Sequence, residues 1–287
     1  MFRFTLVLFG AGLLALIIAC ITDIRTREVP DWLNYSLTSF ALGSALIMSL
    51  FHGYPHIFLN ALLCLGVGLV IGLLMFYTGQ WGGGDSKLII GLSALIGVGA
   101  SEFAGGLPLL LIFMINILFV GAVYGIVFSI AKAAANLKVF KKAFEERLRT
   151  KQMIIIRILF LVLGLASLGF FLAVKSYEAT VLFLFLVMVF LLVYLWNFIS
   201  VVEKKTMIKK MRVNDLTEGD WVVRPVKKKN KIILEPSKTG VTKKQIQALK
   251  RHRIRSVAVK VGLPFVPSFL IAYVLTLMFG NWLVYLF

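Results

Sequence analysis

Residues 4–22 read FTLVLFGAGLLALIIACIT, and Asp23 follows directly. An apolar run of about 20 residues is what a helix needs to cross roughly 30 Å of hydrocarbon. Apolar residues make up 60% of the 287 positions and charged residues only 15%, which is far from the composition of soluble proteins. Outward from the first run, comparable stretches recur at 33–51, 57–77, 88–103, 107–131, 153–174, 179–200 and 264–286. The sequence therefore predicts an all-α polytopic membrane protein with about eight transmembrane helices, and counts from six to eight are compatible with it.

Two stretches interrupt the membrane pattern and divide the chain. One is a basic loop, and the other is a small basic α+β domain that precedes the last helix. The expected organisation is a membrane core at 1–131, a cytosolic loop at 132–152, a transmembrane hairpin at 153–202, the cytosolic domain at 203–262 and a final helix at 263–287. We expect the loop to continue a helix out of the membrane.

The small domain has signals for both strands and a helix. Trp221–Arg224 and Lys231–Leu234 are expected to form two strands around a polar turn at 227–230, and Ser256–Lys260 a third strand. Thr242, followed three residues later by Gln245, predicts a capped helix through about residue 252.

The net charge of +18 raises the question of nucleic-acid binding, and the position of the charges answers it. With the N-terminus outside, 29 of the 31 Lys and Arg residues fall in cytosolic segments, and only Arg3 and Lys175 lie outside. This distribution is the positive-inside rule, so topology accounts for the charge without any nucleic acid. Anionic lipid headgroups are the expected partners of these basic segments.

The cysteine content limits the chemistry further. Cys20 and Cys64 both lie within expected spans, so neither a disulfide framework nor a Cys-rich metal site is expected. Arg3 before an apolar run resembles a secretory signal, but no small-residue cleavage pattern follows. We therefore expect a retained first helix, and no metal or other cofactor.

Two acidic residues lie where acidic residues are costly. Asp23 ends the first apolar run, and Asp85 opens the fourth, directly after Gly82, Gly83 and Gly84. An ionisable side chain at a membrane boundary is a functional candidate because its desolvation must be compensated. The predicted topology places both on the cytosolic side, which allows them to face each other.

Simpler interpretations exist for each residue alone. Asp85 after a glycine turn is also an ordinary helix start, and Asp23 alone is compatible with an interfacial residue. Three consecutive glycines, however, permit close backbone approach and unusual dihedral angles that a cap does not require. The run Gly82–Gly84 therefore favours a shaped turn that presents Asp85.

A pair of nearby carboxylates has a defined chemistry. Two such groups within a few Å cannot both ionise easily, so they share a proton near neutral pH. The ionised member can take a proton from water, and the protonated member can polarise a scissile carbonyl. Sequence does not assign these roles, because coupled groups titrate as a pair.

At this point the motifs carry a family resemblance. Asp23 followed by VPDWLN at 29–34, and GGGD at 82–85 followed by Lys87 and Leu88, resemble the two signatures of the type IV prepilin peptidases, including archaeal preflagellin peptidases. The segment from Gly240 through Phe269 is similar to the archaeal branch, which carries a cytosolic module before its last span. The Gly-x-Gly-Asp element is shared with presenilin-type proteases.

The resemblance implies a role for each matching residue. Asp23 and Asp85 would be the catalytic pair, with Gly82, Gly83 and Gly84 forming the active-site loop. The positions with a possible supporting role are Asp31, Asn34 and Lys87. From the residues alone, we expect Asp31 to cap a helix after Pro30, and Lys87 to be an interfacial anchor.

The implied activity is that of a membrane aspartic endopeptidase. It would remove the short basic leader of prepilin-like or preflagellin-like precursors at the cytosolic face of the cell membrane. The two Cys-x-x-Cys pairs of bifunctional bacterial members are missing, so N-methylation is not expected. Two alternatives remain: a presenilin-like or signal-peptide-peptidase-like intramembrane protease, and a non-enzymatic transporter or scaffold.

Overall fold

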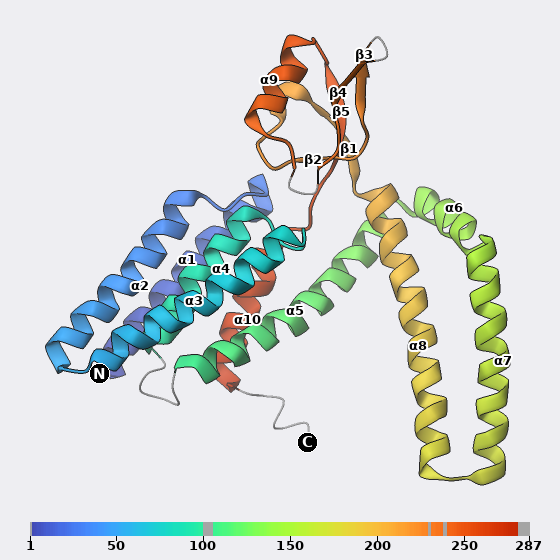
Figure 1. The fold of residues 1–287 in the computed structure, drawn as a ribbon, viewed down its shortest axis with the longest axis horizontal. Helices are drawn as coiled ribbons and strands as arrows, with labels where there is room; N and C mark the ends of the chain where they lie inside the picture. Colours follow the sequence, from blue (N-terminus) through green and yellow to red (C-terminus); the bar gives the residue numbers. More distant parts are fainter. Residues whose placement is uncertain (1, 100–105, 229–230, 238–239, 281–287) are drawn as a thin grey trace. The chain divides into compact units, whose positions relative to one another are not determined.

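The computed structural model describes residues 2–99, 106–228, 231–237 and 240–280 (Figure 1). It separates into two units, one of Met1–Gly125 with Met211–Phe287 and one of Ile126–Lys210. Six of the described helices are long and apolar enough to cross a membrane: Phe4–Thr26, Asp31–His52, Pro55–Tyr77, Pro108–Ala135, Lys151–Val174 and Tyr177–Thr206. The prediction of a polytopic membrane protein is therefore confirmed.

Two further helices correspond to the expected fourth and last spans. Helix α4 covers Gly83–Gly99 and helix α10 covers Val266–Phe279, with 17 and 14 residues. The expected ends of these spans, at 100–103 and 281–286, lie outside the described residues.

The membrane part of the first unit is a bundle around α4. Helix α4 packs against its three predecessors, and α10 packs against the first of them. Most residues of α4 from Ser86 to Gly99 are buried, which makes it the central helix. The helices packed against α4 are α1 (Phe2–Thr26), α2 (Asp31–His52) and α3 (Pro55–Tyr77), and the first part of α5 (Gly106–Ala135) contributes to the same hydrophobic core.

Local sequence explains the sharp turn between α2 and α3. Gly53 ends α2 with a left-handed φ of 68°, a conformation that favours glycine. Pro55 then occupies the first position of α3, where a missing N–H costs nothing. The two helices are thus placed side by side as an antiparallel pair (Figure 1).

The second unit is a helical hairpin with a short amphipathic helix before it. After the end of α5, it contains α6 (Leu137–Leu148), α7 (Lys151–Val174), α8 (Tyr177–Val201) and the π-helix η2 (Val202–Thr206). Thr150 and Ser176 cap the two hairpin helices with their side-chain oxygens. The expected basic loop begins with the last turn of α5, which ends at Ala135, and a separate helix, α6, follows after Asn136.

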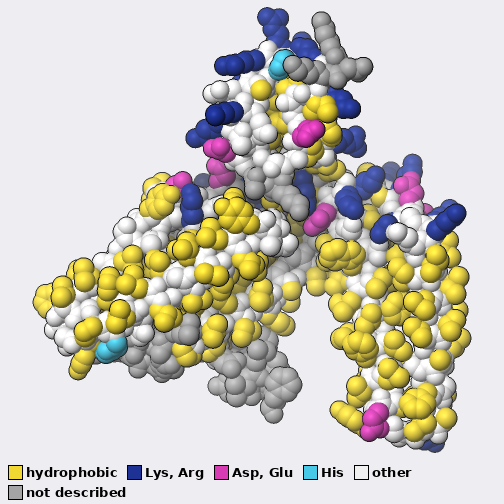
Figure 2. Space-filling view, in the orientation of Figure 1, with side chains coloured by type: hydrophobic (Ala, Val, Ile, Leu, Met, Phe, Trp, Pro, Cys, Tyr) yellow, Lys and Arg dark blue, Asp and Glu magenta, His cyan; other side chains and the backbone are white. Residues whose placement is uncertain are grey.

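Polar pairs join the two hairpin helices and α6 within an otherwise apolar surface. Arg157 Nε donates to Tyr194 Oη at 2.9 Å, and Arg147 Nε donates to Asn197 Oδ1 at 2.8 Å. Figure 2 shows that the surface of this hairpin is hydrophobic over most of its length. Such a surface suits contact with lipid chains.

The small module before α10 has its own hydrophobic core, formed by Val213, Leu216, Val222, Leu234, Val241, Ile246, Leu249, Val257 and Val259. A three-stranded sheet has the order β1-β5-β2, and β3 pairs with β4. The elements are β1 (Ile208–Arg212), the 3-10 helix η3 (Val213–Asp215), β2 (Trp221–Val222), β3 (Val226–Lys228), β4 (Lys231–Leu234), α9 (Lys243–Arg251) and β5 (Ser256–Lys260). Figure 2 shows Lys and Arg side chains around its surface.

Part of the expected module is confirmed and part is wrong. The capping box of Thr242 and Gln245 opens α9, and β5 lies where the third strand was expected. The predicted pairing of 221–224 with 231–234 is wrong, because β2 pairs antiparallel with β5, Trp221 opposite Lys260. The partner of β4 is β3, whose residues 227 and 228 were expected in the turn.

Candidate active site

Asp23 lies in the last turn of α1 and its side chain is almost fully buried, with 5% exposed. Its Oδ2 accepts a hydrogen bond of 3.0 Å from the backbone N–H of Val266, the first residue of α10. Arg27 follows just beyond the helix end, and its charge acts favourably on the Asp23 carboxylate. Asp23 thus interacts with Arg27, near the end of its own helix, and with the backbone of Val266 at the start of α10.

Asp85 lies in the first turn of α4, and its Oδ2 accepts a hydrogen bond of 3.1 Å from the N–H of Gly82. The glycine loop therefore folds back onto the carboxylate that follows it. The charge of Asp23 acts on Asp85, so the two carboxylates lie close enough to repel each other when both are ionised. The structure brings these two predicted residues together at one end of the bundle.

Gly84 is where the glycine loop contacts the VPDWLN segment. A Cβ on Gly84 would lie 3.1 Å from the N and Cβ of Val29 and 3.2 Å from its carbonyl oxygen. Backbone at that distance has little room to move, so only glycine fits without a shift. The close approach lets the start of α4 pack directly against the chain that enters α2.

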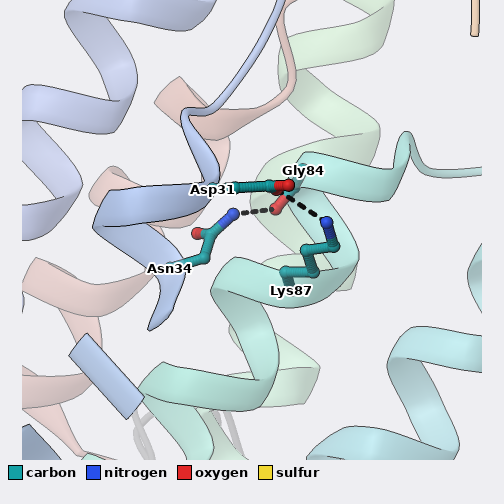
Figure 3. A network of polar contacts seen from close by, with 4 residues as sticks. All are labelled: Asp31, Asn34, Gly84 and Lys87. Atoms are coloured by element: carbon teal, nitrogen blue, oxygen red, sulfur yellow. Dashed lines mark hydrogen bonds and ion pairs between the residues drawn. The ribbon is translucent and has the colours of Figure 1, made fainter. Parts of the chain in front are cut away.

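The three predicted supporting residues lie around the same contact (Figure 3). Asn34 Nδ2 donates to the carbonyl oxygen of Gly84 at 3.3 Å. Lys87 Nζ lies 2.6 Å from Asp31 Oδ1, and its ammonium group also lies 5.5 Å from the centre of the Tyr35 ring. Two side chains of α2 therefore hold the first turn of α4 by a hydrogen bond and an ion pair.

The expectation that Asp31 caps a helix is wrong. The N-cap of α2 is Pro30, without a side-chain cap, and Asp31 is the first helical residue. The role of Lys87 as an interfacial anchor stays a prediction, and its ammonium pairs with Asp31, 56 residues earlier in the chain. A local sequence pattern does not show this partner, because it comes from a distant segment.

Sequence reasoning missed the contribution of the last helix to this region. Val266 holds Asp23 across 243 positions of sequence, and Trp81, directly before the glycine loop, contacts Phe265 and Phe269. The sequence signals were the prolines at 264 and 267, which indicated a break before the last span, and the resemblance of the segment ending at Phe269 to the archaeal branch. Tyr124 of α5 also interacts electrostatically with Asp23.

The described residues contain no group of three or more His, Cys, Asp or Glu side chains that could hold a metal ion. What this region offers is a pair of carboxylates, with a backbone N–H bound to each. That arrangement can share one proton between two acids and can exchange it with water.

Comparison with known proteins places the pair within a matched segment. The model of the Type IV leader peptidase family matches residues 10–128. A preflagellin peptidase of Methanococcus maripaludis is 36% identical over 85 residues, which cover 30% of this chain and 36% of that protein. A preflagellin peptidase of Methanocaldococcus jannaschii is 35% identical over 95 residues, covering 31% and 37%.

The aligned segments cover less than two fifths of the length of these curated relatives. No solved structure matches this chain. The family match includes Asp23, the VPDWLN segment and the complete glycine loop with Asp85. Residues 10–128 of this chain are therefore similar to the Type IV leader peptidase family.

Proposed function

We propose that this chain is a membrane aspartic endopeptidase in which Asp23 and Asp85 form the catalytic pair. The observation that carries the proposal is their meeting at one end of the bundle, α1 supplying the first and α4 the second. Because both residues fall within the matched family segment, their proximity has a functional explanation that two isolated helix-end residues would not have.

The chemistry follows from the shared proton. The ionised carboxylate takes a proton from a water molecule, which attacks the scissile carbonyl carbon, and the protonated carboxylate polarises the carbonyl oxygen. Both carboxylates keep a backbone donor, Val266 for Asp23 and Gly82 for Asp85, so neither has to find a new position during turnover. The reaction needs no cofactor.

The substrates we propose are prepilin-like or preflagellin-like precursors, cut between a short basic leader and a hydrophobic helix. The support comes from the relatives, each of which is named a preflagellin peptidase. The charge distribution supports a site at the cytosolic face, with the N-terminus outside. We do not expect N-methylation, because Cys20 and Cys64 cannot supply two Cys-x-x-Cys pairs.

Three neighbouring side chains have a supporting role in this proposal. Asp31, Asn34 and Lys87 hold the first turn of α4 against α2 and so limit the positions open to Asp85. The basic side chains of the module and of α6 contact anionic lipid headgroups, worth about 1 kcal/mol for each residue near the surface.

The test is cleavage of synthetic precursors by the detergent-solubilised chain. Asp23→Asn and Asp85→Asn should each abolish cleavage nearly as completely as the double variant, because residues that act as a unit are strongly non-additive. Asp85→Glu should restore little, since displacement of the carboxylate by about 1 Å costs on the order of 100-fold in rate. The variants are compared at matched membrane abundance.

Two results would contradict the proposal. Retained cleavage in Asp23→Asn would show that a residue other than Asp23 supplies the second catalytic group. Ion-dependent thermal stabilisation without cleavage of any precursor would support the transporter alternative instead.

A further inference from the structure

The last helix contacts the proposed catalytic pair although it lies outside the segment matched by the family. The match ends at residue 128, whereas Val266 opens α10 and donates its N–H to Asp23 at 3.0 Å. A helix N-terminus carries unpaired N–H groups and a partial positive charge, so it stabilises a carboxylate placed against it. Here the carboxylate is one that the proposed reaction uses.

Helix α10 is fixed in the bundle by polar contacts well below this end. Tyr273 Oη donates to the carbonyl oxygen of Phe9 in α1 at 3.2 Å. Asn116 Nδ2 of α5 donates to Thr276 Oγ1 at 2.8 Å. These two hydrogen bonds join α10 to two neighbouring helices, so the position of its first turn is set by the bundle as well as by Asp23.

An aromatic cluster connects the start of α10 to the loop that carries Asp85. The ring centres of Trp81 and Phe265 lie 6.1 Å apart, and those of Trp81 and Phe269 lie 5.1 Å apart. Phe265 and Phe269 are 5.3 Å apart in an edge-to-face arrangement. Because Trp81 directly precedes Gly82, one cluster links the structural elements that hold the two carboxylates.

Phe265 also lies tightly against α5. A Cβ placed on Gly121 would come within 2.6 Å of Phe265 Cζ, so a side chain there would displace the ring. For the next glycine on the helix, Gly125, the part of the chain that the structure describes places no atom outside its own helix backbone and chain neighbours within 4 Å of a Cβ. A substitution of Gly121 should therefore displace the Phe265 ring. A substitution of Gly125 on the same helix is the matched control.

We propose that the start of α10 forms part of the active site together with α1 and α4. In this proposal, Phe265 positions the backbone N–H of Val266 so that it donates to Asp23. This inference rests on the proposed function, and it adds positioning residues from a segment that the family match does not reach. Displacing Phe265 moves the donor, and the ionised form of Asp23 then loses a stabilising hydrogen bond. The other groups whose charges interact with Asp23 are Cys20 and Arg27 on its own helix, Asp85 on α4 and Tyr124 on α5.

Activity measurements test the inference through paired variants. Phe265→Ala and Gly121→Ala should each lower kcat by about tenfold or more, with little change in KM, since a shift of about 1 Å at the chemistry costs on the order of 100-fold. The acidic limb of the pH–activity profile should move to higher pH in both. Adding Phe265→Leu to Gly121→Ala should restore part of the activity, because the branched side chain is shorter than the ring.

Gly125→Ala should behave as the unsubstituted chain in all three measurements. A purely structural role of Phe265 would change the amount of folded protein but leave kcat per folded molecule and the pH profile unchanged. That result would overturn the inference, and so would an additive effect of the double variant.

Hydrogen exchange tests the contact without any substrate. In Asp23→Ala the amide of Val266 should exchange faster than in the unsubstituted chain, whereas Asp85→Ala should leave its protection unchanged. Equal protection of Val266 in all three proteins would overturn the inference even if cleavage is observed. Conversely, if no precursor is cleaved, faster exchange in Asp23→Ala alone would support the contact and reject only the proposed function.

Discussion

Helix α4 of the first unit and helix α7 of the second unit are both apolar, and both contain glycines, yet the glycines have opposite surroundings. A Cβ on Gly97 of α4 would lie 2.8 Å from the carbonyl oxygen of Asn60 and 2.9 Å from the Cα of Ala61. On α7, a Cβ on Gly164 or Gly169 would meet no atom of the described residues within 4 Å, apart from its own helix backbone and chain neighbours. In α4 the missing side chain brings backbones together, and in α7 it leaves open surface.

The difference shows what hydrophobicity alone does not determine in a membrane protein. Lipid chains are as apolar as leucine, so helices associate through close packing and polar contacts rather than through the hydrophobic effect. Most of α4 from Ser86 onwards is buried, whereas only 6% of the apolar window of α7 is buried within the structure. The helix that carries Asp85 is therefore the one fixed by backbone contact.

Gly84→Val tests whether this backbone contact controls the site, and we expect the largest effect here. The new side chain would meet the Val29 backbone at 3.1–3.2 Å and turn Asp85 away from Asp23. A displacement of about 1 Å corresponds to a loss of activity on the order of 100-fold. The measurement is cleavage of a synthetic precursor, normalised to folded, membrane-inserted protein.

Gly164→Val is the control for that experiment, since the same substitution enters open space on α7. It should leave cleavage unchanged within about twofold. Full activity in Gly84→Val would mean that the glycine loop is an ordinary helix start and that the position of Asp85 does not depend on contact with Val29.

A comparison of Gly97→Ala in α4 with Gly169→Ala in α7 measures how an added methyl group on each helix changes the stability of the protein. In α4 the added methyl group must displace backbone of α3, which costs about 1–3 kcal/mol as overpacking. In α7 the same change replaces glycine by a better helix former and should be neutral or slightly stabilising. Thermal unfolding in detergent measures both, and equal melting temperatures would show that α4 is not packed as tightly as the structure indicates.

The membrane spans were predictable from sequence because each one depends on its own composition. The pattern around 4–22 identified α1, and similar runs identified the other long helices. Local capping signals were equally informative: Thr242 and Gln245 form the expected capping box. Such features need only residues that are neighbours in the chain.

Strand pairing in the module was not predictable in the same way. The strand Trp221–Val222 has two residues, and it pairs with Val259 and Lys260 near the other end of the module. A hairpin signal between adjacent strands favoured the wrong partner, because alternation of side chains indicates a strand but does not choose its neighbour. The choice depends on packing over the module core.

Of the candidate site, only the residues whose side-chain type and local motif suggest a reaction were predictable from the sequence. Asp23 and Asp85 were proposed as a pair because each is an acidic residue at the end of an apolar run and because the motifs around them resemble those of one family. The bond from Val266 to Asp23 and the pairing of Asp31 with Lys87 join residues 243 and 56 positions apart. No local pattern encodes such contacts, since they arise only when the bundle is assembled.

The smallest effect is expected for the ion pair of Asp31 and Lys87, although it lies beside the glycine loop. The side chains of Lys87 and Asp31 are 39% and 59% exposed, and exposed pairs contribute only about 0.2–1 kcal/mol because water and salt screen them. Asp31→Asn and Lys87→Met should therefore each reduce cleavage by less than about fivefold, and the double variant should be no worse than either one, since the second change removes a partner already lost. Asn34→Ala is the sharper comparison: Asn34 is 1% exposed and its amide donates to the carbonyl oxygen of Gly84, so the substitution removes a hydrogen bond made by a buried side chain and costs about 0.5–1.5 kcal/mol. A loss of cleavage in Asp31→Asn as large as in Asp85→Asn would give Asp31 a direct part in the chemistry and would break the distinction between the buried contacts of α4 and the exposed ones at its edge.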